Sequence, residues 1–585
     1  MLPDWLRKRY DLLWKSFKQN PFTFDEAKKL LMAENHDSEN QINVFLAELR
    51  NHDYIITEKN EKDARKRIYK LVPFTDVQEP FSPQGSRSDL YALLKQAADL
   101  IRTRVDYTYI LLLLFYKRIC DKWKNEYEKE YDAALSDGLT KSEAHEEAKR
   151  AAYHDFDIPE EFLWKNLREE SVRLPERLSE AMKKMAERNP KWRIIFENAD
   201  FLQFTQSQEN AEILRQLVEL FSSKSLDAIS SDILGDAYEW ILRYFAPTKA
   251  KEGEVYTPRE VIRLMVEMLS PQPNQSVYDP ACGSAGMLTL SYKHVLDEHG
   301  PDGANKLFLF GQESNFKTIA LAEINLYLHD IKNAMLNQGD TLLFPKFKEK
   351  EKLRKFDMVI ANPPWNQDGY EESTLKKGEF WRERFSQGFP TKQSADWAWI
   401  QHMLTSADDK GKVAIVMDNG ALFRGGKEKN IRKSIADNYL LECVILLPEK
   451  LFYNTGAPGA IIIFNRAKPK NMLDKILFIN ASTEYEQHPD VRKLNRLGDE
   501  HIEKIADAYR EFSTLDGFSR VVALDEIREN DYNLNVTLYV FPEEEVEEIN
   551  LDKEWSEIRK LEDELQKIEK KIGSYLEEVR EGERV

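Results

Sequence analysis

Short apolar runs alternate with longer amphipathic stretches through the second half of the chain. The apolar runs occupy residues 276–279, 307–310, 358–361, 413–417, 443–447, 460–464 and 476–479, and one further run ends at 337–340. A short apolar run bounded by turn residues predicts a buried strand, and the amphipathic stretches between the runs predict helices. Strands alternating with helices are typical of an α/β fold, so we predict a sheet of about seven strands within residues 246–500.

The regions before this domain have different patterns. Helical spacing of apolar residues predicts a helical domain at 89–245, and 76–88 has the Pro, Gly and Ser content of a linker. Residues 1–75 predict three helices and then two alternating strands around a charged tip, which resembles a winged helix. Basic residues of the tip could follow a phosphate backbone, but acidic neighbours dilute them. DNA contact, protein docking and a solvated wing therefore all remain open.

A heptad pattern marks the last part of the chain. After a C-terminal region at 501–548, residues 549–585 predict a coiled-coil helix. Its apolar positions alternate at spacings of three and four: Ile558, Leu561, Leu565, Ile568, Ile572, Tyr575 and Val579. A single helix cannot bury such a stripe by itself, so the pattern favours docking on a partner.

Composition narrows the class of protein. The 585 residues carry a net charge of −18, so any contact with nucleic acid must come from local basic patches. The three cysteines lack metal-ligand spacing, so we expect no metal site and a reducing compartment. The longest apolar run, 109–116, is too short to cross a bilayer, and the first residues lack a signal-peptide core. We therefore expect a cytoplasmic protein with no membrane contact.

The strongest chemical signal is the turn Asn362-Pro363-Pro364-Trp365 after the run 358–361. Two prolines cannot continue a strand, so the chain must leave the sheet at its carboxyl edge, where open α/β sheets bind ligands. The Asn362 side-chain oxygen and the Pro363 carbonyl can accept the two hydrogens of an exocyclic amine. Trp365 can stack on a base that has left its helix. An ordinary strand-ending turn would look the same, so the context has to decide.

The context is a set of polar residues at successive strand ends. Asp279, Glu313, Asp340 and Asn362 follow four predicted strands in order. Small residues at 282–286 form a tight turn before a helix, and a helix N-terminus favours a carboxylate. A carboxylate at the end of the second strand can accept the hydroxyls of a ribose. Without a Walker A sequence, this set fits a cofactor with a carboxylate, a ribose and an adenine but no phosphate.

Two further segments flank this predicted site. Thr257, Pro258 and Glu260 have the spacing of a capping box, so we expect Thr257 to cap a helix. The segment 423–433 is basic and glycine-punctuated and follows a strand, which fits either a DNA-backbone contact or a solvated loop.

From about residue 88 onward, the sequence resembles the modification subunits of type I restriction–modification systems. The motifs that carry the resemblance are Tyr-Thr-Pro at 256–258, Asp-Pro-Ala-Cys-Gly-Ser-Ala-Gly at 279–286 and Asn-Pro-Pro-Trp at 362–365, together with 411–417, 423–426, 452–456 and 532–535. Two departures concern the site: Ala285 stands where a glycine is usual, and Trp365 replaces the commoner Phe or Tyr. Residues 1–75 lie outside the resemblance.

The resemblance implies a Rossmann-like methyltransferase domain that transfers a methyl group from S-adenosyl-L-methionine to the N6 amine of adenine in DNA. It implies that the target base is held by Asn362, Pro363, Pro364 and Trp365. It also implies a cofactor site formed by Tyr256, Thr257, Asp279, Ala281, Gly283, Ser284, Gly286, Glu313, Asp340 and Asn362.

The same resemblance implies partners. They are double-stranded DNA, a specificity subunit that carries two modification chains, and a restriction and translocase subunit. Chemistry alone leaves cytosine-N4 methylation open, because the two exocyclic amines are alike. A protein glutamine-N5 methyltransferase also uses an Asn-Pro-Pro-aromatic turn, but the long flanking domains argue against it.

Overall fold

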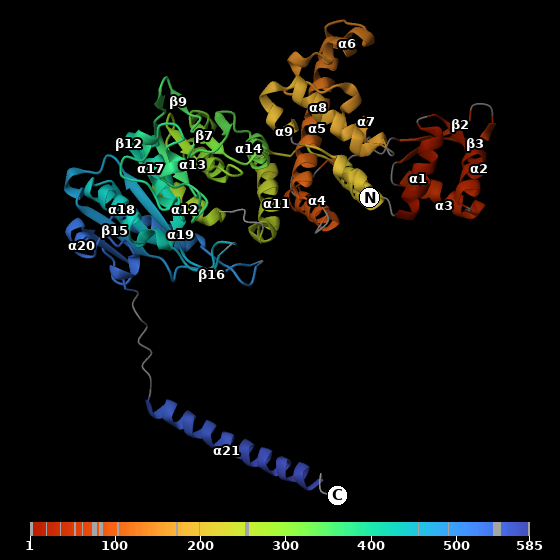
Figure 1. The fold of residues 1–585 in the computed structure, drawn as a ribbon. Coiled ribbons are helices and arrows are strands. Elements are labelled where there is room, and N and C mark those ends of the chain that lie inside the picture. The colour runs from red at the N-terminus through yellow and green to blue at the C-terminus, as the bar shows by residue number, and fades with distance from the viewer. Residues whose placement is uncertain are drawn as a thin grey trace.

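The computed structural model describes the chain except residues 1–3, 19, 36, 52–53, 61–62, 73–78, 81–85, 102–104, 171–172, 198, 228, 252–256, 454, 490, 542–550 and 583–585. Figure 1 shows a large α/β unit, a helical domain beside it, a small N-terminal unit on the far side of that domain, and a separate C-terminal helix.

The α/β unit is built on a nine-stranded sheet, in the order β18-β15-β13-β14-β12-β11-β6-β7-β8. Every predicted strand is present: β6 (Ser276–Asp279), β7 (Phe308–Glu313), β8 (Ala334–Gln338), β11 (Phe356–Ala361), β12 (Ala407–Asp418), β13 (Leu441–Leu446), β14 (Gly459–Asn465) and β15 (Lys475–Asn480). The expected count of about seven was too low. The ninth strand, β18 (Ser519–Ala523), comes from the segment expected as a separate C-terminal region and pairs antiparallel with β15.

The order of the parallel strands creates a switch point. β7 and β8 continue outward on one side of β6, and the chain then returns to place β11 on the other side. β11 runs parallel to both β6 and β12, so these strands end at the same edge of the sheet. The crevice between β6 and β11 at that edge is where open α/β sheets bind ligands.

Both faces of the sheet are buried, and successive side chains alternate between two cores. Met358 and Ile360 of β11 face one core, whereas Val359 and Ala361 face the other. The first core is covered by α12 (Arg259–Leu269), α13 (Gly286–Ala304) and α19 (Asp499–Glu511). The second is covered by α17 (Asp396–Ser406), α18 (Lys427–Asp437) and α20 (Leu524–Glu529). Burial on both faces explains why the strands are near-continuous apolar runs.

Eight α-helices form the helical domain in the described part of residues 86–251. They are α4 (Ser86–Ile101), α5 (Thr108–Ser136), α6 (Lys141–Ala148), α7 (Trp164–Glu169), α8 (Leu174–Arg188), α9 (Arg193–Glu197), α10 (Gln208–Ser222) and α11 (Ser231–Lys251). Their core also takes in Leu321, Ile324 and Leu328 of α14 (Phe316–Leu328). Ala322 and Leu326 of the same helix face the sheet, so α14 belongs to two cores at once.

The N-terminal unit has the elements predicted for it. α1 (Asp4–Phe17), α2 (Phe24–Asn35) and α3 (Glu39–Asn51) precede the hairpin of β2 (Ile55–Asn60) and β3 (Asp63–Leu71). The short β1 (Phe22–Thr23) completes a three-stranded sheet. No helix in the described part of the whole chain is long and apolar enough to cross a membrane.

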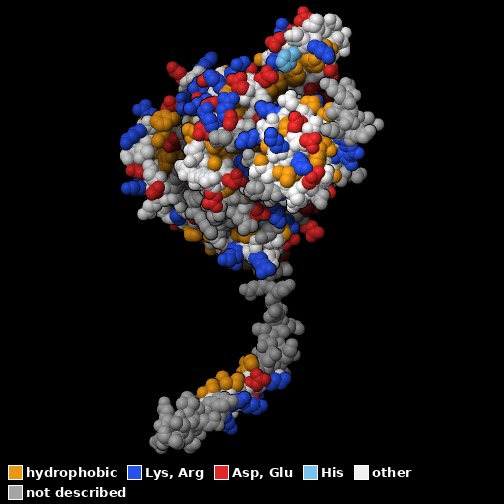
Figure 2. Space-filling model, turned by 90° about the vertical axis from the view of Figure 1, so that its right-hand side faces the viewer, with side chains coloured by type: hydrophobic (Ala, Val, Ile, Leu, Met, Phe, Trp, Pro, Cys, Tyr) orange, Lys and Arg blue, Asp and Glu red, His pale blue; other side chains and the backbone are white. Residues whose placement is uncertain are grey.

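The C-terminal helix α21 (Leu551–Gly582) lies away from the rest of the molecule. Its described apolar side chains are all exposed: Trp555, Ile558, Leu561, Leu565, Ile568 and Ile572. Figure 2 shows hydrophobic side chains gathered along one side of the helix and Lys and Arg along another. The stripe predicted from the heptads is therefore present at these positions, whereas the side chains of Tyr575 and Val579 lie outside the described residues.

Gly235 of α11 provides a test of the contact between the helical domain and the sheet. A Cβ at this position would lie 2.2–2.5 Å from ring atoms of His329, which is buried just after α14. Gly235→Ala should lower stability by about 1–3 kcal/mol through overpacking, although alanine has the better helix propensity. Calorimetric unfolding temperatures of the full chain would measure the change.

Gly573 of α21 is the matched control, because a Cβ there meets no described atom within 4 Å. Gly573→Ala should leave the main unfolding transition unchanged. Equal transitions for Gly235→Ala and the parent chain would contradict the close approach of α11 and His329.

Candidate active site

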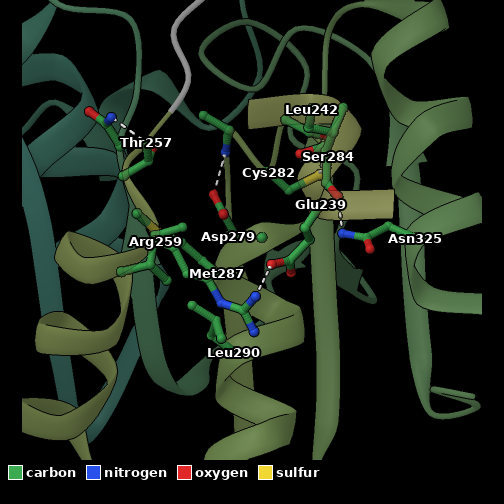
Figure 3. Close-up of a pocket in the computed structure, with 15 residues that line it drawn as sticks. Glu239, Leu242, Thr257, Arg259, Asp279, Cys282, Ser284, Met287, Leu290 and Asn325 are labelled. Atoms are coloured by element: carbon green, nitrogen blue, oxygen red, sulfur yellow. Dashed lines mark hydrogen bonds and ion pairs between the residues drawn. The ribbon is translucent and has the colours of Figure 1, made fainter. Parts of the chain in front are cut away.

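A pocket lies at the switch point between β6 and β11 (Figure 3). The ends of these two strands contribute Asp279 and Asn362, and the turn after β6 contributes most of the floor. Its lining residues are Glu239, Leu242, Thr257, Arg259, Ile262, Asp279, Ala281, Cys282, Gly283, Ser284, Gly286, Met287, Leu290, Asn325 and Asn362. Seven of the residues expected at the cofactor site therefore lie around one cavity: Thr257, Asp279, Ala281, Gly283, Ser284, Gly286 and Asn362.

The turn between β6 and α13 is tight and partly left-handed. Gly283 has φ of +51° and Ala285 has φ of +65°. Glycine adopts this conformation readily, but the Cβ of Ala285 makes it strained. Ala285, which stands where the resembling family usually has a glycine, therefore occupies a position whose backbone conformation favours glycine. α13 begins at Gly286, as expected.

Asp279 is buried at the base of the pocket, with 2% of its surface exposed. Its Oδ1 accepts a hydrogen bond from the Ala281 backbone N–H at 3.0 Å. Desolvation raises the pKa of this carboxyl to about 8, and the negative charge of Glu313 adds to the rise. A cation bound in the pocket would lower this pKa again.

Glu313, at the end of β7, does not line the pocket but supports its floor. Its Oε2 accepts from the Gly283 N–H at 3.1 Å, and its Oε1 accepts from the Asn315 N–H at 2.7 Å. Oε1 also accepts from the Ser314 hydroxyl at 3.2 Å, so Oε2 is the oxygen that keeps a further lone pair for a ligand. The predicted position at a strand end is thus correct, and the carboxylate also holds the glycine turn in place.

Asp340 lies beyond the end of β8 and outside the lining of the pocket. Its Oδ1 accepts from the Leu343 N–H at 3.0 Å, and its Oδ2 accepts from the Tyr370 hydroxyl at 2.8 Å. Burial of Tyr370 and the neighbouring Asp340 charge raise the pKa of that phenol. Tyr256, which the sequence also placed at this site, is outside the described residues.

The side chain of Asn362 is held from both sides. Its Nδ2 donates to Thr257 Oγ1 at 2.8 Å, and its Oδ1 accepts from Trp365 Nε1 at 2.8 Å. The expectation that Thr257 caps a helix was wrong. Pro258 is the N-cap residue of α12 and has no side-chain cap, while the Thr257 hydroxyl is directed to Asn362.

Trp365 packs edge-on against Phe452, with ring centroids 4.8 Å apart and an interplanar angle of 68°. Gly459 of β14 lies beneath both rings, because a Cβ there would be 2.8 Å from Phe452 and 3.0 Å from Trp365. Pro363 is buried and Pro364 is exposed, so the turn does leave the sheet as predicted. In the described part of the chain, no hydrogen bond reaches the Pro363 carbonyl.

Three polar residues of the lining, Glu239, Arg259 and Asn325, were missed because they come from outside the strand ends. Glu239 of α11 forms an ion pair with Arg259 at 2.7 Å, and its burial raises its pKa. Asn325 of α14 donates from Nδ2 to the Ser284 carbonyl at 2.9 Å, and its buried Oδ1 has no partner among the described residues. The one available signal was an asparagine between two apolar residues of a predicted helix, Ile324 and Leu326.

The basic segment 423–433 has structural partners. Arg424 forms ion pairs with Asp396, Asp418 and Glu428, and the guanidinium of buried Arg432 donates to the Tyr532 and Ala421 carbonyls. These two arginines fit neither of the two interpretations left open by the sequence, a DNA-backbone contact or a solvated loop, because their charges and hydrogen-bond donors hold α18 in the fold. Lys429 likewise pairs with Asp531.

Comparison with known proteins gives two family matches. Residues 229–548 match the family described as N-6 DNA Methylase, and residues 90–221 match the HsdM N-terminal domain. Two relatives from Methanocaldococcus jannaschii cover almost the whole chain. The MjaVII methylase subunit of a type I restriction enzyme is 44% identical over 98% of both chains, and the MjaVIII methylase subunit is 44% identical over 98% of this chain and 97% of its own.

A solved structure agrees with these relatives. The methyltransferase subunit of a type I restriction–modification system from Streptococcus thermophilus has 28% identity and a TM-score of 0.66, and the match covers 78% of this chain and 99% of that one. A modification subunit of a type I restriction enzyme from Vibrio vulnificus, at 20% identity and a TM-score of 0.51, shares the fold. The chain belongs to the N-6 DNA methylase family as a type I restriction enzyme methylase subunit, an adenine-specific DNA methyltransferase that uses S-adenosyl-L-methionine.

Proposed function

We propose that Asn362 and Pro363 hold the amine of a flipped adenine while the base stacks on Trp365. The observation that carries this proposal is the double anchoring of Asn362 by Thr257 and Trp365. An indole N–H only donates, so the atom of Asn362 that faces it must be the amide oxygen. That oxygen keeps a second lone pair, which is available to an amine hydrogen.

The chemistry explains why two acceptors are needed. The lone pair of the adenine amine is delocalised into the ring, so the amine is a poor nucleophile. Acceptors that hold both hydrogens out of the ring plane return the lone pair to the nitrogen. Asn362 Oδ1 and the Pro363 carbonyl supply two acceptors from consecutive residues, and the proline ring fixes the second one in place.

The pocket residues fit S-adenosyl-L-methionine, which supplies a methyl group from a sulfonium when bound. Asp279 is a buried carboxylate with a raised pKa, and the buried Asn325 oxygen lacks a donor. Both would be satisfied by the positive methionine end of the cofactor, so we assign that end to them. The remaining lone pair of Glu313 Oε2 is assigned to a ribose hydroxyl, and Asp340 is assigned to the adenine.

We further infer that the chain acts in the cytoplasm within an assembly on double-stranded DNA. In this proposal, two methylase chains share one specificity subunit, and a restriction and translocase subunit joins for cleavage. The exposed stripe of α21 supports a docking role, because an isolated helix cannot bury it. The net charge of −18 also disfavours tight solitary binding to a polyanion.

Proton release tests the role of Asp279. Its pKa is about 8 without ligand, and a neighbouring cation stabilises the ionised form, so binding should release a proton. At pH 6.5 the α-amino group of the free cofactor is already protonated, so it takes up no further proton on binding. Calorimetry in buffers of different ionisation enthalpy should give close to one proton released, and affinity should weaken by up to about tenfold per pH unit below pH 8.

Asp279→Asn should abolish this release and weaken cofactor binding. Glu323 is the matched control: its burial raises its pKa to about 7, but it does not line the pocket. Glu323→Gln should release the same proton as the parent chain. A parent chain that releases no proton would contradict the assignment of Asp279.

Substitutions at the turn separate amine activation from base capture. Asn362→Ala should reduce single-turnover methyl transfer by roughly 100-fold or more, by analogy with the loss of one catalytic hydrogen bond, while cofactor affinity stays within a few fold. Trp365→Phe keeps a stacking ring but loses the indole donor to Asn362, so turnover should fall by a few fold, or about 1 kcal/mol.

Trp365→Ala should instead weaken capture of the base by about 1–3 kcal/mol. Fluorescence of 2-aminopurine placed at the target position would measure flipping in each variant. Near-normal transfer by Asn362→Ala would overturn the activation argument, whatever its effect on flipping.

Two aspartates in the stripe of α21 test docking. Leu565→Asp with Ile572→Asp places charges on exposed apolar positions one heptad apart. The variant should bind cofactor normally but fail to co-purify with the specificity subunit or methylate its site. Glu562→Asp with Glu569→Asp adds the same residue at the same spacing and should behave as the parent. Normal co-purification of the first variant would exclude the stripe as the docking surface.

A further inference from the structure

An open groove lies next to the Trp365 turn, with a volume of about 520 Å³. One side is formed by Lys450, Phe452, Tyr453, Thr455 and Gly456. The other is formed by residues 492–495, which run from the turn of a hairpin into its second strand; the hairpin consists of β16 (Glu486–Gln487) and β17 (Asn495–Arg496). Two hydrogen bonds join the two sides: Asn495 N–H to the Lys450 carbonyl and Asn495 Nδ2 to the Glu449 carbonyl, both at 2.9 Å. The groove is therefore built by the fold.

The groove is positively charged. Lys450, Arg492 and Lys493 line it with exposed side chains, and none has a carboxylate partner in the described part of the chain. Arg496 of the same hairpin offers a contrast, because it pairs with Glu486 at 2.7 Å and does not line the groove. Three unneutralised cations around one cavity are notable in a chain with a net charge of −18.

An aromatic ring joins the groove to the base-binding turn. Phe452 lines the groove and also contacts Trp365, with ring centroids 4.8 Å apart. Both rings rest on Gly459, which has no room for a side chain. Phe452 thus connects the groove that holds the cations to Trp365, the ring on which the flipped base is proposed to stack. In segment 423–433, by contrast, Arg424, Lys429 and Arg432 have partners within the fold.

We propose that this groove binds the phosphodiester backbone of the target strand beside the flipped adenine. The inference rests on the proposed function and adds the surface that holds the strand. A flipped nucleotide rotates about its backbone, so its flanking phosphates must be fixed while the base enters the pocket. Lysine and arginine supply that contact without reading sequence, and the neighbouring aromatic ring suits a base out of its stack.

The test uses the full chain in complex with its specificity subunit and a duplex that contains the site. Arg492→Gln with Lys493→Gln should lower affinity about tenfold at moderate salt. It should also reduce the slope of log affinity against log salt by about 1.8, or about 0.9 for each lost phosphate contact. Cofactor affinity, measured by calorimetry, should not change.

The matched control is Lys306→Gln with Lys475→Gln. These exposed lysines lie at the amino ends of β7 and β15, at the opposite edge of the sheet from the site. The control should keep the parent slope. An unchanged slope in the groove variant would overturn the proposal, as would loss of the specificity subunit from the complex, which would identify a protein-docking surface instead.

Neutral methylphosphonates locate the contact. Replacing the phosphates that flank the target adenine should lower the affinity of the parent complex for the duplex. The same replacement should lower the affinity of the Arg492→Gln with Lys493→Gln complex little further, because that variant has already lost the same interaction. The same replacement in the opposite strand should weaken both proteins equally. If the methylphosphonates and the substitutions lowered affinity additively on the target strand, the groove would not be the phosphate-binding surface. Adenine methylation by the parent complex tests the proposed function separately.

Discussion

The parallel pairing of β11 with β6 determines where the chemistry of this protein can occur. Val277 and Tyr278 of β6 register with Met358 and Val359 of β11, and the two strands end at one edge of the sheet. Since β7 and β8 extend from the other side of β6, the connections diverge at this edge and leave a crevice. Residues distant in sequence, Asp279 and Asn362, therefore line one pocket. Burial of β11 on both faces fixes the register on which this placement depends.

The features predicted correctly from sequence are those set by local pattern. Strands buried on both faces must be apolar throughout, so their positions and the polar residues at their ends could be found. β18 was missed because it is a short edge strand, half exposed and interrupted by Arg520. The capping box at Thr257 failed for a different reason. A local pattern competed with a hydrogen bond to Asn362, which only the tertiary structure brings within reach.

The parts of the site that could not be predicted are contributed by packing. Glu239 and Asn325 reach the pocket because α11 and α14 pack against the turn after β6, and neither residue belongs to a local motif. The hydrogen bond from the Trp365 indole to Asn362 could not be predicted either, since the sequence indicated only that Trp365 supplies a stacking ring. Chemistry alone also left adenine and cytosine amines equivalent, and the family match decides between them.

The position of α14 in two cores has a consequence for how the molecule can be divided. Leu321, Ile324 and Leu328 are buried by the helical domain, whereas Ala322 and Leu326 are buried by the sheet. Removing the helical domain would expose three large side chains to water, at about 1.5–3 kcal/mol each. It would also remove the packing on one side of the helix that carries Asn325. We therefore expect the two halves to unfold in one cooperative transition, so that the catalytic half is not a transplantable module.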